Sequence, residues 1–241
     1  MRHSNIDQYA RESNFYHFDS RAKIIGILIF VIFVALLRDF ITLIIAFGFI
    51  ILIILISNIP GSHIFKRYLL TLPFIIFASL AVLFTNDLIM FFSMYLRIST
   101  CILALIILSC TTPFFDLLKG LQSLKLPGIF IVLLMFTYRY FFVFIEESHR
   151  MRQARAARGF TGGKHLLDKR GMKTISYTAG MLLIRAYNRG VRIYDSLLVR
   201  GFDGKIRTLT PFKITGLDLV FGLILIFMGI YLFYYDWLVI I

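Results

Sequence analysis

Long apolar segments, separated by short polar ones, dominate this chain. They are nearly continuous, without the alternation of a half-buried strand, and their length favours helices. A helix needs about 20 residues to cross a bilayer, and the shorter segments reach that span only with flanking residues, tilt or local thinning. Six apolar segments occur, at residues 24–37, 40–56, 69–84, 88–110, 128–145 and 214–235. The pattern predicts an all-α, polytopic membrane protein.

A short two-faced helix is predicted between the fourth and fifth segments. We expect Thr112 to cap it and Pro113 to take its first position, and Pro127 follows its end. Polar residues fill one side, as in a helix lying at the membrane surface. The other side carries Phe114, Leu117, Leu118, Leu121 and Leu124.

Two longer helices follow. The first begins apolar near Ile129 and becomes rich in alanine and arginine after Glu146. The second is two-faced and basic, with polar positions at Arg185, Asn188, Arg189, Arg192 and Asp195. Its apolar stripe consists of Leu183, Tyr187, Val191, Tyr194 and Leu198.

Composition agrees with a membrane protein, because 59% of the residues are hydrophobic and the mean hydropathy is +0.83. The net charge is +13. Of the 26 basic residues, 15 lie between Glu146 and Lys213. Such a block is typical of a cytoplasmic loop, since Lys and Arg resist translocation. No nucleic-acid motif accompanies it, so nucleic acid is not an expected partner.

The same charge rule predicts the topology. Basic residues before the first span predict a cytoplasmic N-terminus, and we expect Lys66 and Arg67 in a later inside loop. If residues 128–145 crossed the membrane, the basic block would lie outside. We therefore expect five spans, with residues 128–145 not crossing. The basic residues before the first span are Arg2, Arg11, Arg21 and Lys23.

Both basic helices end on nearly the same residues, Ala157-Arg158-Gly159-Phe160 and Val199-Arg200-Gly201-Phe202. Each ending has an arginine eight residues upstream, Arg150 and Arg192. A single Arg-Gly ending is explained by helix capping, because glycine adopts the left-handed conformation and arginine complements the helix dipole. Two copies favour a docking role, in which each arginine enters an acidic groove.

These endings belong to a wider resemblance, which includes Tyr138-Arg139-Tyr140, Phe202-Asp203-Gly204 and Thr111-Thr112-Pro113, and also Asp19, Arg21 and Lys23. The chain resembles the T component of energy-coupling-factor (ECF) transporters, and within it the CbiQ branch. The resemblance implies that both helices dock into two ABC-type ATPase subunits. Val199 departs from the usual alanine. The implied coupling residues are Ala157, Arg158, Gly159, Val199, Arg200 and Gly201, supported by Glu147, Arg150, Arg155 and Arg192.

The resemblance implies a non-catalytic coupling subunit in the cell membrane. It would hold no cofactor itself, because the chain lacks a Gly-x-x-x-x-Gly-Lys-Ser/Thr loop; ATP and Mg would sit on the partners. A CbiM-like capture (S) subunit would take cobalt or nickel, with a vitamin as the alternative cargo. The expected organisation is residues 1–110 with four spans, a three-helix coupling module at 111–213, and a last span at 214–241.

Other candidates carry weaker predictions. Arg97 lies within an apolar segment, where a functional role and a packing role remain open, and Arg139 lies beside tyrosines on which it can stack. Cys101 and Cys110 are expected to be packing residues, and no metal site is expected from the scattered histidines. Rival functions are a lipid-modifying enzyme acting on head groups, or a membrane scaffold for an unrelated partner.

Overall fold

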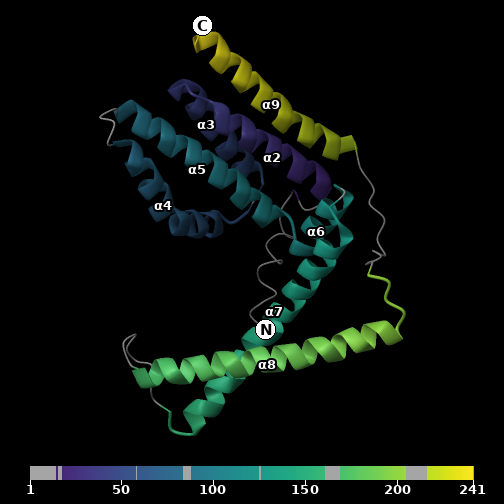
Figure 1. Cartoon of the computed structure of the whole chain (residues 1–241). Coiled ribbons are helices and arrows are strands. Elements are labelled where there is room, and N and C mark those ends of the chain that lie inside the picture. The colour runs from purple at the N-terminus through teal and green to yellow at the C-terminus, as the bar shows by residue number, and fades with distance from the viewer. Residues whose placement is uncertain are drawn as a thin grey trace. The chain divides into compact units, whose positions relative to one another are not determined.

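The structure is a computed structural model that describes Phe15 and residues 18–57, 59–83, 88–124, 126–160, 169–204 and 216–240. These residues form eight helices and no strand, which confirms the predicted all-α class. They group into two compact units, residues 1–125 with 209–241, and residues 126–208. Figure 1 shows the helices of each unit.

The first unit contains six helices: α2 (Ser20–Leu36), α3 (Phe40–Ile56), α4 (Gly61–Leu83), α5 (Leu88–Thr111), α6 (Phe114–Ser123) and α9 (Gly216–Ile240). The second contains α7 (Gly128–Ala157) and α8 (Lys169–Val199). By length and composition, α4, α5, α7 and α9 are long and apolar enough to cross a membrane, and α3 is a shorter apolar helix. The chain is a multi-pass membrane protein.

Helices α2 and α9 lie side by side and run in the same direction (Figure 1). At one end the backbone N–H of Asp19 donates to Asp218 Oδ1 at 2.9 Å. At the other end the N–H of Asp39 donates to Asp236 Oδ1 at 2.8 Å. Small residues bring the helices close, since a Cβ added at Gly229 would lie 2.9 Å from the Phe33 ring.

Helix α5 runs antiparallel to α2. Lys23 near the start of α2 donates through Nζ to the carbonyl of Thr111 at the end of α5, at 3.2 Å. Helix α6 lies against the start of α2, where a Cβ on Gly120 would meet Ile24 at 2.8 Å. The end of α5, part of α6 and the start of α9 therefore meet the same end of α2.

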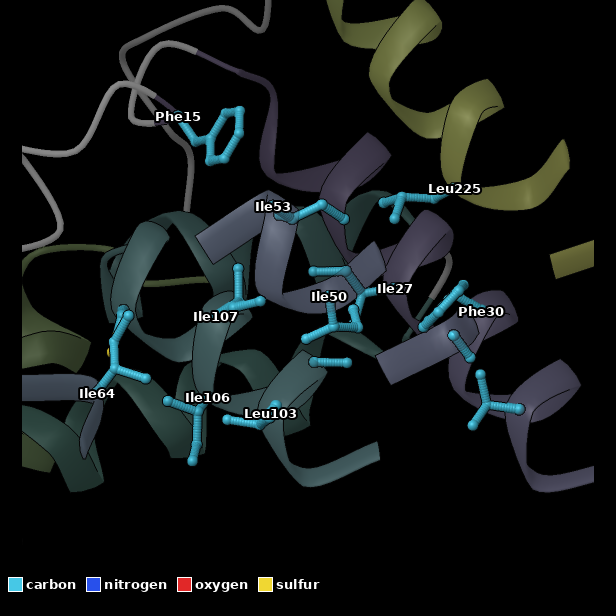
Figure 2. Packing of buried hydrophobic residues seen from close by; sticks show 14 of the residues in the cluster. Phe15, Ile27, Phe30, Ile50, Ile53, Ile64, Leu103, Ile106, Ile107 and Leu225 are labelled. Atoms are coloured by element: carbon cyan, nitrogen blue, oxygen red, sulfur yellow. The ribbon is translucent and has the colours of Figure 1, made fainter. Parts of the chain in front are cut away.

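The core of the first unit lies between α2, α3, α5 and α9 (Figure 2). Phe30, Ile50 and Leu225 are at most 2% exposed there. Many apolar side chains on the outer faces of the same helices remain exposed, as expected where lipid replaces protein contacts.

The structure corrects two local predictions. Thr112 does not cap α6: its N–H bonds to the Leu108 carbonyl and so continues the α5 ladder at 3.1 Å, while Pro113 takes the cap position. The Thr112 hydroxyl is buried without a hydrogen-bond partner. Lys66 and Arg67 lie within α4 and not in a loop. Helix α6 packs against α2 in the first unit, and the grouping of residues 111–213 as one coupling module stays a prediction.

Candidate functional site: two arginine-ended helices

Helices α7 and α8 cross in the second unit (Figure 1). Two polar contacts join them. The Arg185 guanidinium forms an ion pair with the Glu147 carboxylate, and Arg155 Nη1 donates to Thr178 Oγ1 at 2.7 Å. Glu147 precedes Arg155 on α7, whereas its partner Arg185 follows Thr178 on α8. The two helices therefore cross with opposed directions.

Both helices end in the same hydrogen-bonded cap. At the end of α7, the N–H of Gly159 donates to the Ala156 carbonyl at 3.0 Å and that of Phe160 to the Arg155 carbonyl at 3.1 Å. This is the Schellman pattern, which needs a left-handed residue, and Gly159 has φ +75°.

The second cap repeats this geometry. The N–H of Gly201 donates to the Leu198 carbonyl at 2.9 Å, and that of Phe202 to the Leu197 carbonyl at 3.0 Å. Gly201 has φ +69°. Nothing lies within 4 Å of a Cβ built on either glycine, so the backbone conformation, and not close packing, explains why glycine stands there.

The caps place Arg158 and Arg200 at equivalent positions, each immediately before its glycine and each exposed. Ala157 and Val199 are exposed as well, Val199 at 89%. The cap explains why a glycine follows each arginine. It also holds each arginine at a fixed helix end, where its side chain is exposed.

The two arginines are well separated. Thr178 contacts Arg155, one turn from Arg158, and Arg200 lies 22 residues after Thr178, directly beyond the end of α8. At 1.5 Å per residue this length is about 33 Å, so the arginines lie roughly 30 Å apart. That spacing suits two separate binding grooves better than one.

The supporting residues on α7 are engaged in pairs. Arg150 donates to Glu146 at 2.6 Å, with both side chains mostly exposed, and exposed pairs of this kind add little stability. Arg155 also lies over the Phe160 ring, at 6.0 Å from its centroid. Arg192 is exposed on α8.

The intramembrane candidates have packing partners. Arg97 Nη2 donates to the Leu37 carbonyl at 2.5 Å, which satisfies an acceptor at the end of α2. Arg139 lies over the Tyr140 ring at 6.0 Å.

Within the described residues, no group of three or more His, Cys, Asp or Glu side chains could hold a metal ion. Both cysteines are free thiols, with Cys110 buried and Cys101 half-buried, in line with packing roles.

The sequence-based prediction missed two carboxylates on α9. Asp218 and Asp236 are 2% and 3% exposed, and each accepts backbone N–H groups at an end of α2 or the start of α3. Their spacing of 18 residues is five helical turns, so they share one face. Acidic residues inside a largely apolar segment were the available signal.

The fold and the site define a class: a helical, multi-pass membrane protein with a separate unit of two crossed, arginine-ended helices. The sequence profile of the family described as cobalt transport protein, CbiQ, matches residues 12–211. The chain belongs to the CbiQ family.

Three individual proteins are similar in sequence to this chain. A protein of Rhodobacter capsulatus named cobalt transport protein CbiQ is 35% identical over 49% of this chain and 46% of its own length. A putative fused cobalt transport protein CbiMQ of Methanocorpusculum labreanum is 38% identical over 42% of this chain and 16% of its own. An uncharacterized protein of Methanocaldococcus jannaschii is 26% identical over 96% of this chain and 86% of its own. The matched stretches thus span less than half of either relative named for cobalt transport.

Proposed function

We propose that this chain is the energy-coupling membrane subunit of an ECF-type ABC importer. Arg158 and Arg200 would each dock into one of two ATPase subunits. The observation that carries the proposal is the pair of matching caps, because each holds an exposed guanidinium at a fixed helix end. A planar guanidinium can form paired, charge-assisted hydrogen bonds with a carboxylate in a groove.

The geometry of the first unit supports a position for α7 and α8 on one side of the membrane. The end of α5 and the start of α9 both lie beside the start of α2, and therefore on the same side of the bilayer. The chain between α5 and α9 must then cross the bilayer an even number of times. Helix α8 does not qualify as a span among the described helices. Helix α7 qualifies by length and composition, but a single crossing would break this parity. We therefore infer that neither helix crosses.

The basic block between α5 and α9 makes that side the cytoplasm, where ATPase subunits meet their nucleotide. The N-terminus then also lies inside, and the protein resides in the cell membrane. ATP-driven closure of the two ATPases would change the separation or angle of the two arginines. The crossed helices would pass that movement to a capture subunit, which moves the cargo.

The cargo is proposed from the family. Its description as cobalt transport protein supports Co(II), with Ni(II) as the related alternative and a vitamin as the more distant one. The relative named CbiMQ is described as a fusion, which supports a CbiM-like partner. The chain itself would be non-catalytic, with ATP and Mg bound by the ATPases.

Charge reversal tests the proposal. Arg158→Glu combined with Arg200→Glu should abolish co-purification of the ATPase subunits, or leave hydrolysis uncoupled from cobalt uptake, because two acidic grooves would then face carboxylates. The single reversals Arg158→Glu and Arg200→Glu are each compared with Lys173→Glu, which makes the same change of charge at another exposed position of α8.

The measurements are subunit recovery from detergent and uptake of labelled cobalt in cells. Normal recovery together with normal uptake by the double variant would refute the coupling role. A loss of equal size in Lys173→Glu would show that net charge, and not the helix ends, is responsible.

A further inference from the structure

A cleft of about 520 Å³ opens between α7 and α8, beside the first arginine cap. The end of α7 contributes Arg152, Arg155 and Phe160, and α8 contributes Ile175, Ala179 and Leu182. One wall is therefore cationic and the other apolar. Among the residues that the structure describes, no acidic side chain lines this cleft.

Arg155 has donor capacity left inside the cleft. Its Nη1 donates to Thr178, but its Nε is buried and has no hydrogen-bond partner. A buried donor without an acceptor is destabilising. A carboxylate entering the cleft would pair with the remaining guanidinium N–H groups of Arg155 and with Arg152. A large apolar side chain beside it would cover Ile175 and Leu182.

The position of the cleft indicates which partner supplies that carboxylate. Arg155, Ala156 and Phe160 line the cleft and also build the cap that holds Arg158. A protein that binds Arg158 therefore also lies at the opening of the cleft. We propose that the cleft receives an acidic segment, bearing a large apolar side chain, from the ATPase subunit that binds Arg158. This inference rests on the proposed coupling function.

The second cap differs at the corresponding position. Leu197 stands where Arg155 stands in the first cap, and accepts the same backbone hydrogen bond. A leucine offers no donor to a carboxylate. The two ATPase attachments are consequently unequal: the one at Arg158 has an additional anchor, and the one at Arg200 does not.

Filling the cleft tests the inference. Ala179→Trp places an indole between the two walls, and Ala154→Trp makes the same change on the exposed opposite side of α7. With purified full-length chain in detergent and its ATPase subunits as the probe, we expect Ala179→Trp to weaken affinity at least about tenfold, equal to 1.4 kcal/mol. Ala154→Trp should stay within about twofold.

Normal ATPase affinity of Ala179→Trp, alongside loss of binding in Arg158→Glu, would overturn the cleft proposal and leave the coupling function intact. Unchanged binding in Arg158→Glu would instead reject the coupling function.

Crosslinking provides a readout that does not depend on how the tryptophan variant folds. Benzoylphenylalanine at position 182, irradiated in membranes that contain the whole complex, should form an adduct with an ATPase peptide containing Asp or Glu. An adduct with lipid only, or no ATPase adduct, would overturn the proposal.

Discussion

The Asp236 carboxylate links two helix ends that are far apart in sequence. It accepts the N–H groups of Arg38 and Asp39 and the Thr42 hydroxyl, at 2.8–3.1 Å, while 3% exposed. Asp39 occupies the N-cap position of α3 but makes no side-chain cap bond. The cap of α3 is thus supplied by another helix, whose buried carboxylate satisfies the free N–H groups at the start of α3.

Asp236→Ala should lower the free energy of unfolding by about 2–4 kcal/mol, because it leaves several donors without their acceptor. Asp39→Ala, the matched control, should cost less than about 1 kcal/mol, because that carboxylate caps nothing. Thermal unfolding in detergent measures both. Equal losses in the two variants would show that Asp236 is not the cap.

At the scale of the helix, the ends of α7 and α8 depend on one glycine each. Their φ values of +75° and +69° lie in the region that side chains with a Cβ rarely adopt. Replacement forces either strain or a different exit of the chain, and both alter how the preceding arginine is held. The Arg-Gly repeat predicted these caps, because capping is local and is written in adjacent residues.

Gly159→Ala and Gly201→Ala should each destabilise the helix end by about 1 kcal/mol. Gly190→Ala is the control: it lies in the middle of α8 with open space around it and no positive φ, so it should be neutral or slightly stabilising. Amide hydrogen exchange in the last turn of each helix gives the measurement. Unchanged protection in the two cap variants would contradict the role of the glycines.

Contacts between distant segments were less predictable than the helices. Continuous apolar segments indicate helices, because a chain in lipid must satisfy its backbone internally. The capping of α3 by a residue 197 positions later has no local signature. Thr112 was wrongly expected to cap α6 because its sequence context fits a cap, whereas its N–H still belongs to the α5 ladder.

For the whole molecule, the even number of crossings between α5 and α9 makes a topological prediction. In a variant with Cys101 and Cys110 replaced by alanine, a cysteine at position 148 or 195 should react with a membrane-impermeant maleimide only after the cytoplasmic side is opened. A cysteine at position 38, in the turn between α2 and α3, should react in intact cells. Labelling of position 195 from outside would reject the proposed topology.

The parallel pairing of α2 with α9 also has a consequence for biosynthesis. Helix α2 leaves the ribosome long before its neighbour α9 has been synthesised. Until then the small residues along α2 and the polar turn before α3 face lipid or an insertion chaperone. A translation product that ends before residue 216 would lack α9, and the side of α2 that packs against α9 would stay uncovered. Such a product should be recognised and degraded by membrane proteases.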